Sequence, residues 1–298
     1  MPNRALPKKA ILVVNTHSRT GAESFDAATR TLRQAGVELV DTLAVDDPTK
    51  FDEAVRDAVK RAPMVILGGG DGSISSTVDR FVGKKAVLAV LPLGTANSFA
   101  RTLGIPLELE AAVDVVANGR RKQIDLGCIN GDHFANTAVI GLSPLIADTI
   151  PKGLKRVLGR VGYLVWAIRW AVKFAPFRLA ITMNSSTRNF WATEVRIANG
   201  GHFGGIELID EAEVDSGDLV VQAVVGKSKV SLAKSWLGAL IGLTRNAGEV
   251  KEFRAKQFRI ETTPRLDVAI DGETSVKTPI EVSVARAAID VAVPVEGS

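Results

Sequence analysis

The sequence predicts two structural classes in one chain: an α/β N-terminal domain with a Rossmann-like parallel sheet, then a β-rich C-terminal domain folded as an antiparallel sandwich. The first observation is that short apolar runs alternate with amphipathic helical patterns in the N-terminal part. The second is that two glycine turns directly follow apolar runs, as turns do at the carboxyl ends of parallel strands. The third is a change, after Gly119, to many short β-like runs.

The N-terminal elements alternate strand and helix along the chain. Strands are expected at residues 10–14, 37–43, 64–67 and 86–91, and helices at 24–34 and 48–60. In the second helix one face carries all the large apolar side chains and several alanines, namely Phe51, Ala54, Val55, Ala58 and Val59. Asp47 is its predicted N-cap, and Pro48 suits its first turn. One face of this helix should therefore pack on the sheet.

The C-terminal elements are mainly strands. They are expected at residues 134–140, 178–183, 191–197, 219–225, 257–261, 266–270 and 280–284. Helical patterns interrupt them near residues 152–173 and 228–243. The change of rhythm places the boundary between residues 120 and 130, with domains at 1–128 and 129–298. Whether the last strand returns to the first domain is left open.

The composition is that of an ordinary globular protein, with 298 residues of which 46% are hydrophobic and 23% charged. The single cysteine, Cys128, excludes an internal disulfide and a cysteine-cluster metal site. The three histidines lack the spacing of zinc ligands. No export signal is recognisable at the start of the sequence, so a cytoplasmic location is expected.

A long acid-free stretch extends from Thr149 to Thr193, and it is both basic and aromatic. Its charges interrupt the apolar runs, so it cannot cross a bilayer as one helix. One interpretation is an amphipathic helix that lies on an anionic membrane, which predicts a peripheral membrane association. The equally weighted alternative is a core-packed helix with solvated cations. Nucleic acid is not expected as a partner, because no nucleic-acid-binding motif accompanies the charge.

The two glycine turns have the sequences GGGDGS, at Gly68 to Ser73, and PLGTAN, at Pro92 to Asn97. Two such turns at neighbouring strand ends predict one phosphate pocket, because glycine lets backbone N–H groups approach an anion closely. Asp71 in the first turn would repel phosphate unless a cation bridges them, and Mg²⁺ is the expected cation. The plain alternative is that Asp71-Gly72 forms an ordinary turn.

In their order along the chain, the motifs resemble the diacylglycerol kinase catalytic-domain family, in particular the bacterial soluble lipid kinases related to sphingosine and ceramide kinases. The resemblance covers nearly the whole chain. It is carried by Asn15-Thr-His-Ser18, Gly69-Gly-Asp-Gly-Ser73, Pro92-Leu-Gly-Thr-Ala-Asn97, Ile124-Asp-Leu-Gly127, Asn199-Gly200, Phe203-Gly-Gly205, Asp215-Ser-Gly217 and Asp271-Gly-Glu273. GGDG by itself is shared with NAD kinases and phosphofructokinases, so the later motifs decide.

The resemblance implies a nucleotide-binding domain, a lipid-binding domain, and ATP- and Mg²⁺-dependent phosphorylation of a lipid hydroxyl. Asp71 would bind Mg²⁺ or orient that hydroxyl, and Asp271 or Glu273 would be the base. A structural Mg²⁺ would lie near Asp215 and Asp218. The residues that the resemblance assigns to the nucleotide are Asn15, Ser18, Gly69, Gly70, Gly72, Ser73, Gly94, Thr95 and Asn97.

The chain departs from the family pattern at several polar positions. Thr16 and Arg19 replace a proline and a glycine in the first loop. Ser75, Ser76 and Ser98 stand where asparagine, glutamate and aspartate are expected. These changes raise a second hypothesis, a lipid- or nucleotide-binding relative with weakened catalysis. A kinase for a soluble metabolite, of the NAD kinase type, is a third. The sequence does not choose among lipids, and it leaves the oligomeric state open.

Overall fold

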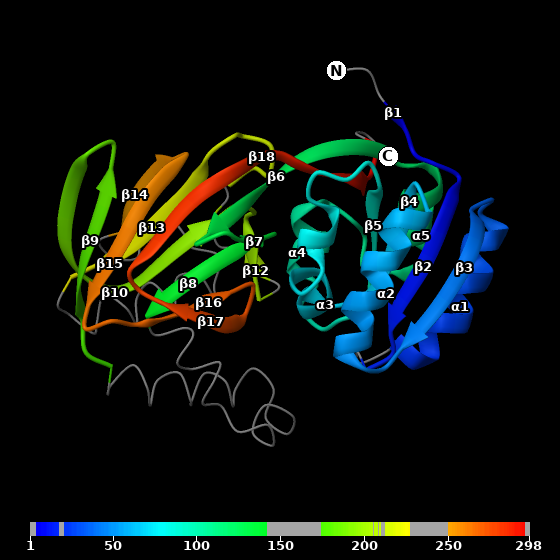
Figure 1. Cartoon of the computed structure of the whole chain (residues 1–298), viewed down its shortest axis with the longest axis horizontal. Coiled ribbons are helices and arrows are strands. Elements are labelled where there is room, and N and C mark those ends of the chain that lie inside the picture. Colours follow the sequence, from blue (N-terminus) through cyan, green and yellow to red (C-terminus); the bar gives the residue numbers. More distant parts are fainter. Residues whose placement is uncertain are drawn as a thin grey trace.

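The computed structural model describes residues 4–17, 21–141, 174–204, 206, 207, 209, 212–226 and 250–295. They form an α/β lobe and a β-rich lobe, side by side in Figure 1. Both helical patterns expected in the C-terminal part, near 152–173 and 228–243, fall outside the described residues, as does most of the acid-free stretch. None of the helices in the described part of the chain is long and apolar enough to span a membrane.

The α/β lobe has a parallel sheet of four strands in the order β3-β2-β4-β5. Their bounds are β2 Lys9–Asn15, β3 Glu38–Val45, β4 Met64–Gly69 and β5 Val87–Pro92. Every residue of β4 and β5 is buried, which explains why both read as uncharged, β-branched runs in the sequence. The prediction of a parallel sheet in this part of the chain is confirmed.

Three longer helices cover this sheet: α1 (Gly21–Gln34), α2 (Pro48–Arg61) and α5 (Leu109–Asn118). In Figure 1, α2 lies in front of the sheet, while α1 and α5 pack together behind it. The predicted apolar face of α2 is buried through Phe51, Val55, Ala58 and Val59. Asp47 caps this helix, because its Oδ1 accepts a hydrogen bond from the Thr49 N–H at 2.9 Å.

The β-rich lobe is antiparallel, as expected. Its long strand β10 pairs with β9 in its first half and with both β13 and β8 in its second half. The bounds of its main strands are β8 Thr137–Gly141, β9 Phe177–Met183, β10 Ser186–Ala198, β13 Leu219–Val225, β14 Val250–Ala255, β15 Gln257–Thr263, β16 Asp267–Ile270 and β17 Glu273–Lys277. Inward-facing side chains from these strands form one apolar core, which includes Phe177, Val195 and Phe258.

Two long strands join the lobes, β6 (Arg120–Ile129) and β18 (Ile280–Val293). They pair antiparallel along most of their length. The first part of β18 pairs with β15 of the sandwich, and Asp290 and Val291 pair in parallel with β5. One hydrogen-bonded sheet therefore continues from lobe to lobe, and the last strand returns to the α/β lobe.

The strand expected at residues 134–140 is divided in two. Phe134 ends the short strand β7 (Asp132–Phe134), and β8 begins at Thr137. Between them, the backbone N–H groups of Ala135 and Asn136 point to a side chain 135 or 136 residues away in the sequence, that of Asp271. The single-strand prediction was wrong here because these two donors serve a distant carboxylate instead of a neighbouring strand.

Candidate active site

The two glycine turns touch backbone to backbone at the carboxyl ends of β4 and β5. The N–H of Leu93 donates to the carbonyl of Gly69 at 2.9 Å. A Cβ on Gly94 would lie only 2.4 Å from the Cα of Gly70, so only glycine fits at this contact. The two turns therefore form one continuous surface, on which Gly72 and Thr95 are exposed, and the predicted phosphate pocket there stays a prediction.

Asn15 and Ser73 connect the first loop to this surface. The Asn15 Nδ2 donates to the Ser73 Oγ at 2.9 Å, and the Asn15 Oδ1 accepts from the His17 N–H at 3.0 Å. Ser73 is buried, so the pair holds the carboxyl end of β2 against the start of α3 (Asp71–Ser75). Ser18, the other loop residue predicted to contact the nucleotide, lies outside the described residues.

Asn97 is engaged by its own turn. It has a left-handed backbone with φ of 50°. Its Oδ1 accepts from the Gly94 N–H at 2.9 Å, and its Nδ2 donates to the carbonyls of Pro92 and Gly94 at 3.2 and 3.1 Å. Asparagine tolerates this conformation better than most residues, and its amide closes the loop. Asn97 thus shapes the second turn, a role that the sequence motif did not reveal.

Asp71 joins the two turns. It is the first residue of α3, and its Oδ1 accepts from the Phe99 N–H at 3.0 Å, in the first turn of α4 (Ser98–Thr102). Asp71 is only half-buried, which keeps the residue near solvent and next to the glycine backbones. This position suits a carboxylate that holds Mg²⁺ beside nucleotide phosphates, because Mg²⁺ typically takes one or two carboxylates from the protein.

Asp271 reaches the same region from the sandwich. It follows β16 in a left-handed turn with φ of 47°, and its carboxylate accepts three backbone hydrogen bonds at 2.8 to 3.0 Å, from Ala135, Asn136 and Thr137. The pKa of Asp271 is raised to about 6, chiefly because desolvation outweighs the lowering by the three donors, with a smaller contribution from the negative charge of Asp71. A carboxyl group with a pKa near neutrality suits a general base.

Glu273, the other predicted base, begins β17, and its side chain lies outside the described part of the structure. The geometry therefore characterises Asp271 alone of the two candidates. The sequence motif placed both residues in one turn and could not distinguish them, because the three donors to Asp271 come from a segment more than 130 residues earlier.

Sequence reasoning missed Thr102 and Asn136 near Asp271, and it gave Asn199 no role there. The Thr102 hydroxyl at the end of α4 donates to the Asn136 Oδ1 at 2.9 Å, from one lobe to the other. Asn199 stabilises the same place, because its Nδ2 donates to the carbonyls of Asp125 and Ala135, both at 2.9 Å. The Asn199-Gly200 motif was the one signal in the sequence that pointed here.

The residues around the second predicted metal site do not fit Mg²⁺ well. Asp215 pairs with Lys122 at 2.9 Å, and Asp218 lies 3.6 Å from Arg254. The Asp125 carboxylate is occupied by two backbone donors at 2.7 Å, the N–H groups of Gly217 and Ala287. In the described parts of the chain no three His, Cys, Asp or Glu side chains gather as a metal site would require. The assignment of Asp215 and Asp218 to a metal stays a prediction.

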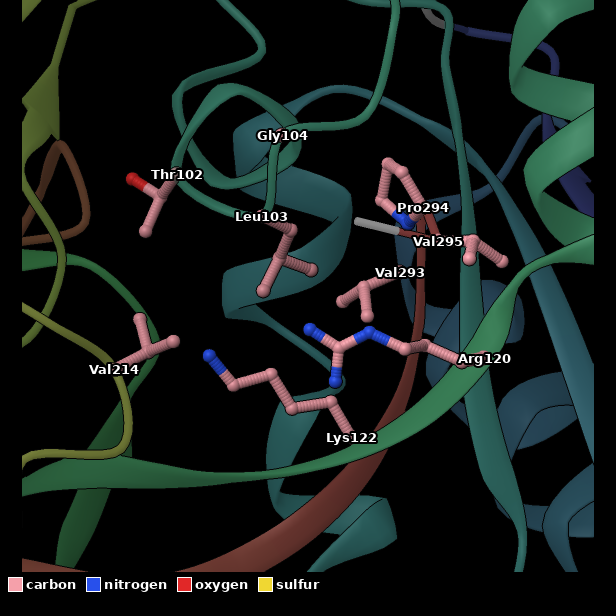
Figure 2. A pocket seen from close by; sticks show the side chains of 9 residues that line it. All are labelled: Thr102, Leu103, Gly104, Arg120, Lys122, Val214, Val293, Pro294 and Val295. Atoms are coloured by element: carbon pink, nitrogen blue, oxygen red, sulfur yellow. The ribbon is translucent and has the colours of Figure 1, made fainter. Parts of the chain in front are cut away.

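Two shallow pockets lie where the linking strands meet the end of α4. The first has a volume of about 220 Å³, and Figure 2 shows the side chains of Arg120 and Lys122 pointing into it. The second, of about 410 Å³, shares Thr102, Lys122 and Val214 with the first. Figure 2 also shows the Thr102 hydroxyl turned away from these two cations.

Comparisons with known proteins agree with this architecture. Residues 9–129 match the family model described as "Diacylglycerol kinase catalytic domain", and residues 139–293 match "YegS C-terminal NAD kinase beta sandwich-like domain". A "Probable lipid kinase YegS-like" of Pseudomonas aeruginosa is 32% identical, over 97% of this chain and 96% of that protein. A "Diacylglycerol kinase" of Mycobacterium tuberculosis is 25% identical over the same shares of both chains.

Solved structures show the same fold. One crystal structure from Bacillus anthracis superposes with a TM-score of 0.83 at 24% identity, over 98% of each chain. Another, of a diacylglycerol kinase from the same organism, has a TM-score of 0.74 at 21% identity, over 96% of this chain and 97% of that one. At these identities the likeness establishes the fold.

Proposed function

This chain belongs to the YegS-like lipid kinases of the diacylglycerol kinase family, and on that premise we propose that it transfers the γ-phosphoryl group of Mg·ATP to the hydroxyl of a diacylglycerol-like or sphingoid lipid. The observation that carries the proposal is that α4 connects Asp71, at the two glycine turns, to Asp271 of the other lobe. Phe99 at the start of α4 donates to Asp71, and Thr102 at its end bonds Asn136, whose backbone N–H donates to Asp271. Phosphoryl transfer needs this combination of anchoring, charge neutralisation and a proton acceptor.

Each group has one task in this proposal. The backbone N–H groups of the two glycine turns bind the nucleotide phosphates. Asp71 holds Mg²⁺, which neutralises charge on the phosphates when it is bound. Asp271 orients the lipid hydroxyl and accepts its proton as the oxygen attacks phosphorus. With a pKa of about 6, Asp271 is mainly the carboxylate at pH 7.

The direct test follows labelled γ-phosphate from Mg·ATP into vesicles that contain diacylglycerol, a sphingoid base or ceramide. The wild type should label at least one lipid, and Asp71→Ala should not. Asp114→Ala, an exposed change on α5, is the matched control and should keep full activity. Labelled lipid from Asp71→Ala at the wild-type rate would remove Asp71 from the site.

A second function is favoured by one observation. Ser98, the first residue of α4, is buried directly before the residue whose N–H binds Asp71, in place of the family's aspartate. If this loss disables turnover, the protein is a lipid- or nucleotide-binding relative. ATP binding without any labelled lipid would favour that function. NAD, included as a soluble acceptor, tests the third alternative, and a labelled NAD product would replace the lipid kinase assignment.

We also propose a peripheral contact with anionic membranes on the cytoplasmic side, with no role for nucleic acid. It is supported by the acid-free stretch and by two cation–π pairs in the described sandwich, Arg178 over Trp191 at 5.2 Å and Arg188 over Phe253 at 5.3 Å. Lys152→Ala with Lys155→Ala should weaken sedimentation with anionic vesicles, most at low salt. Lys84→Ala with Lys85→Ala makes the same charge change on the α/β lobe and should not. Equal binding by all three proteins would rule out this surface.

A further inference from the structure

We propose that α4 sets the position of Asp271 relative to Asp71, with Thr102 and Asn136 as positioning residues for phosphoryl transfer. The inference rests on the proposed kinase function and adds to it two residues that none of the motifs contains. Helix α4 lies on the side of the α/β lobe that faces the sandwich (Figure 1). It is only five residues long, and both its ends bond to groups at the site.

The N-terminal end of α4 is hydrogen-bonded to Asp71. The Phe99 N–H donates to the Asp71 Oδ1 at 3.0 Å, and the Phe99 side chain is almost completely buried, at 2% exposure. Close packing leaves such a residue little freedom to move. The position of α4 therefore determines where the Asp71 carboxylate lies.

The last turn of α4 holds Asn136. The Thr102 hydroxyl donates to the Asn136 Oδ1 at 2.9 Å, and the Asn136 Nδ2 donates to the carbonyl of His202 through a short hydrogen bond. The backbone N–H of Asn136, in turn, donates to the Asp271 Oδ1 at 3.0 Å. A continuous path of hydrogen bonds thus runs from α4 to the carboxylate of Asp271.

Gly200 makes this path possible. The carbonyl of Asn136 accepts from the N–H groups of Asn199 and Gly200, at 2.9 and 3.1 Å. A Cβ on Gly200 would lie 2.3 Å from the Asn136 Oδ1 and 2.5 Å from the Thr102 Cγ2. Only glycine therefore lets Asn136 and Thr102 meet, which gives the Asn199-Gly200 motif a physical reason.

These hydrogen bonds fix the position of the Asp271 carboxylate, on which the rate of phosphoryl transfer depends. The three donors to Asp271 are consecutive, at residues 135 to 137, so a shift of this segment carries the carboxylate with it. A displacement of about 1 Å at a reacting group can cost about a hundredfold in rate. Loss of the Thr102 hydrogen bond should therefore lower kcat and leave KM for ATP unchanged, because the glycine turns are not altered.

The experiment compares three variants in the lipid kinase assay. Thr102→Val has the same shape without the hydroxyl, and we expect kcat to fall about tenfold to a hundredfold. Thr102→Ser keeps the hydroxyl and should stay within about threefold of the wild type. Thr29→Val removes a threonine hydroxyl that donates to the Phe25 carbonyl at 2.8 Å within α1, and serves as the matched control with unchanged kcat.

The outcomes separate the inference from the function on which it rests. A wild type that labels no lipid would refute the proposed function. An active wild type with a Thr102→Val variant of equal kcat would overturn the inference. So would a loss in Thr102→Val that Thr102→Ser does not restore, or one that is matched by a rise in KM for ATP and a lower melting temperature, since either would indicate general disruption. Gly200→Ala should lower both kcat and the melting temperature, because its methyl group would lie 2.3 Å from the Asn136 Oδ1.

Discussion

The carboxylates in two acidic regions of this molecule have different kinds of hydrogen-bond and ion-pair partner. Asp71 and Asp271 bind backbone N–H groups, and among the residues that the structure describes neither forms an ion pair. Asp215 and Asp218, on the loop before β13, face Lys122 and Arg254 instead. Both pairs look alike as sequence motifs. The partners show the difference, since backbone N–H groups bind the first pair and cationic side chains neutralise the second.

The largest effect should come from Asp271→Asn, which keeps the shape of the side chain but cannot accept a proton, and whose Nδ2 cannot accept the backbone bond that one carboxylate oxygen of Asp271 accepts. General base catalysis typically contributes about 10² to 10⁴ in rate, so kcat should fall by that factor while the affinity for ATP stays the same. Asp267→Asn on the same strand, β16, is the matched control, because its side chain is half exposed and pairs only loosely with Lys277 at 3.4 Å. A kcat for Asp271→Asn within a few-fold of the wild type would assign the base to another group.

The second-largest effect should come from a change at the contact between the two glycine turns. Gly94→Ala places a methyl group 2.4 Å from the Gly70 Cα, which demands a backbone shift. Overpacking of this kind costs about 1–3 kcal/mol, so we expect KM for ATP to rise about tenfold, together with a lower melting temperature. Gly70→Ala is the graded comparison, because its methyl group would lie at 3.0 Å. Equal effects of the two changes would contradict the contact as the cause.

The pH dependence of kcat/KM should report the titration of Asp271 in the first acidic region. Desolvation raises the pKa of Asp271 to about 6, so below that pH the group is protonated and cannot accept the proton of the lipid hydroxyl. We expect kcat/KM for the lipid to be level above about pH 7 and to fall about tenfold per pH unit below 6. The residual activity of Asp271→Asn should lack this fall. A fall with the same midpoint in that variant would place the titrating group elsewhere.

Much of the framework could be predicted from sequence, because it depends on local patterns. The apolar runs of β4 and β5, the cap of α2 and the two glycine turns each lie within a few consecutive residues. The strand pattern also indicated the antiparallel sandwich, and family motifs selected Asp71 and Asp271. Pairing with distant segments decided the rest. No local pattern links Asp271 to the N–H of Asn136, which is 135 residues away in the sequence.

The same reason explains the error at residues 134–140. The strand expected there is interrupted because two of its donors serve Asp271. The assignment of Asn97 to the nucleotide stays a prediction, and its amide also closes its own turn through Gly94. In the same way, nothing in the sequence around Lys122 indicates its partner, Asp215, which lies 93 residues later. The residue type at each position therefore indicated its chemistry, but only the folded structure shows which group it contacts.

The smallest effect, and the sharpest test of the comparison, concerns Lys122. Its pair with Asp215 is partly exposed, with 26% and 45% of the two side chains accessible, so Lys122→Met should cost less than about 1 kcal/mol of unfolding free energy. Because Lys122 neutralises the loop, the melting temperature of the wild type without nucleotide should be the same in Mg²⁺ and in a chelator. In Lys122→Met the freed Asp215 should make the melting temperature rise with Mg²⁺, since a ligand that binds only the folded state stabilises it. A melting temperature that falls on chelation by the same amount in the wild type and in Asp71→Ala would mean that the loop holds a metal after all. The two acidic regions would then differ in the role of their cation and not in its presence.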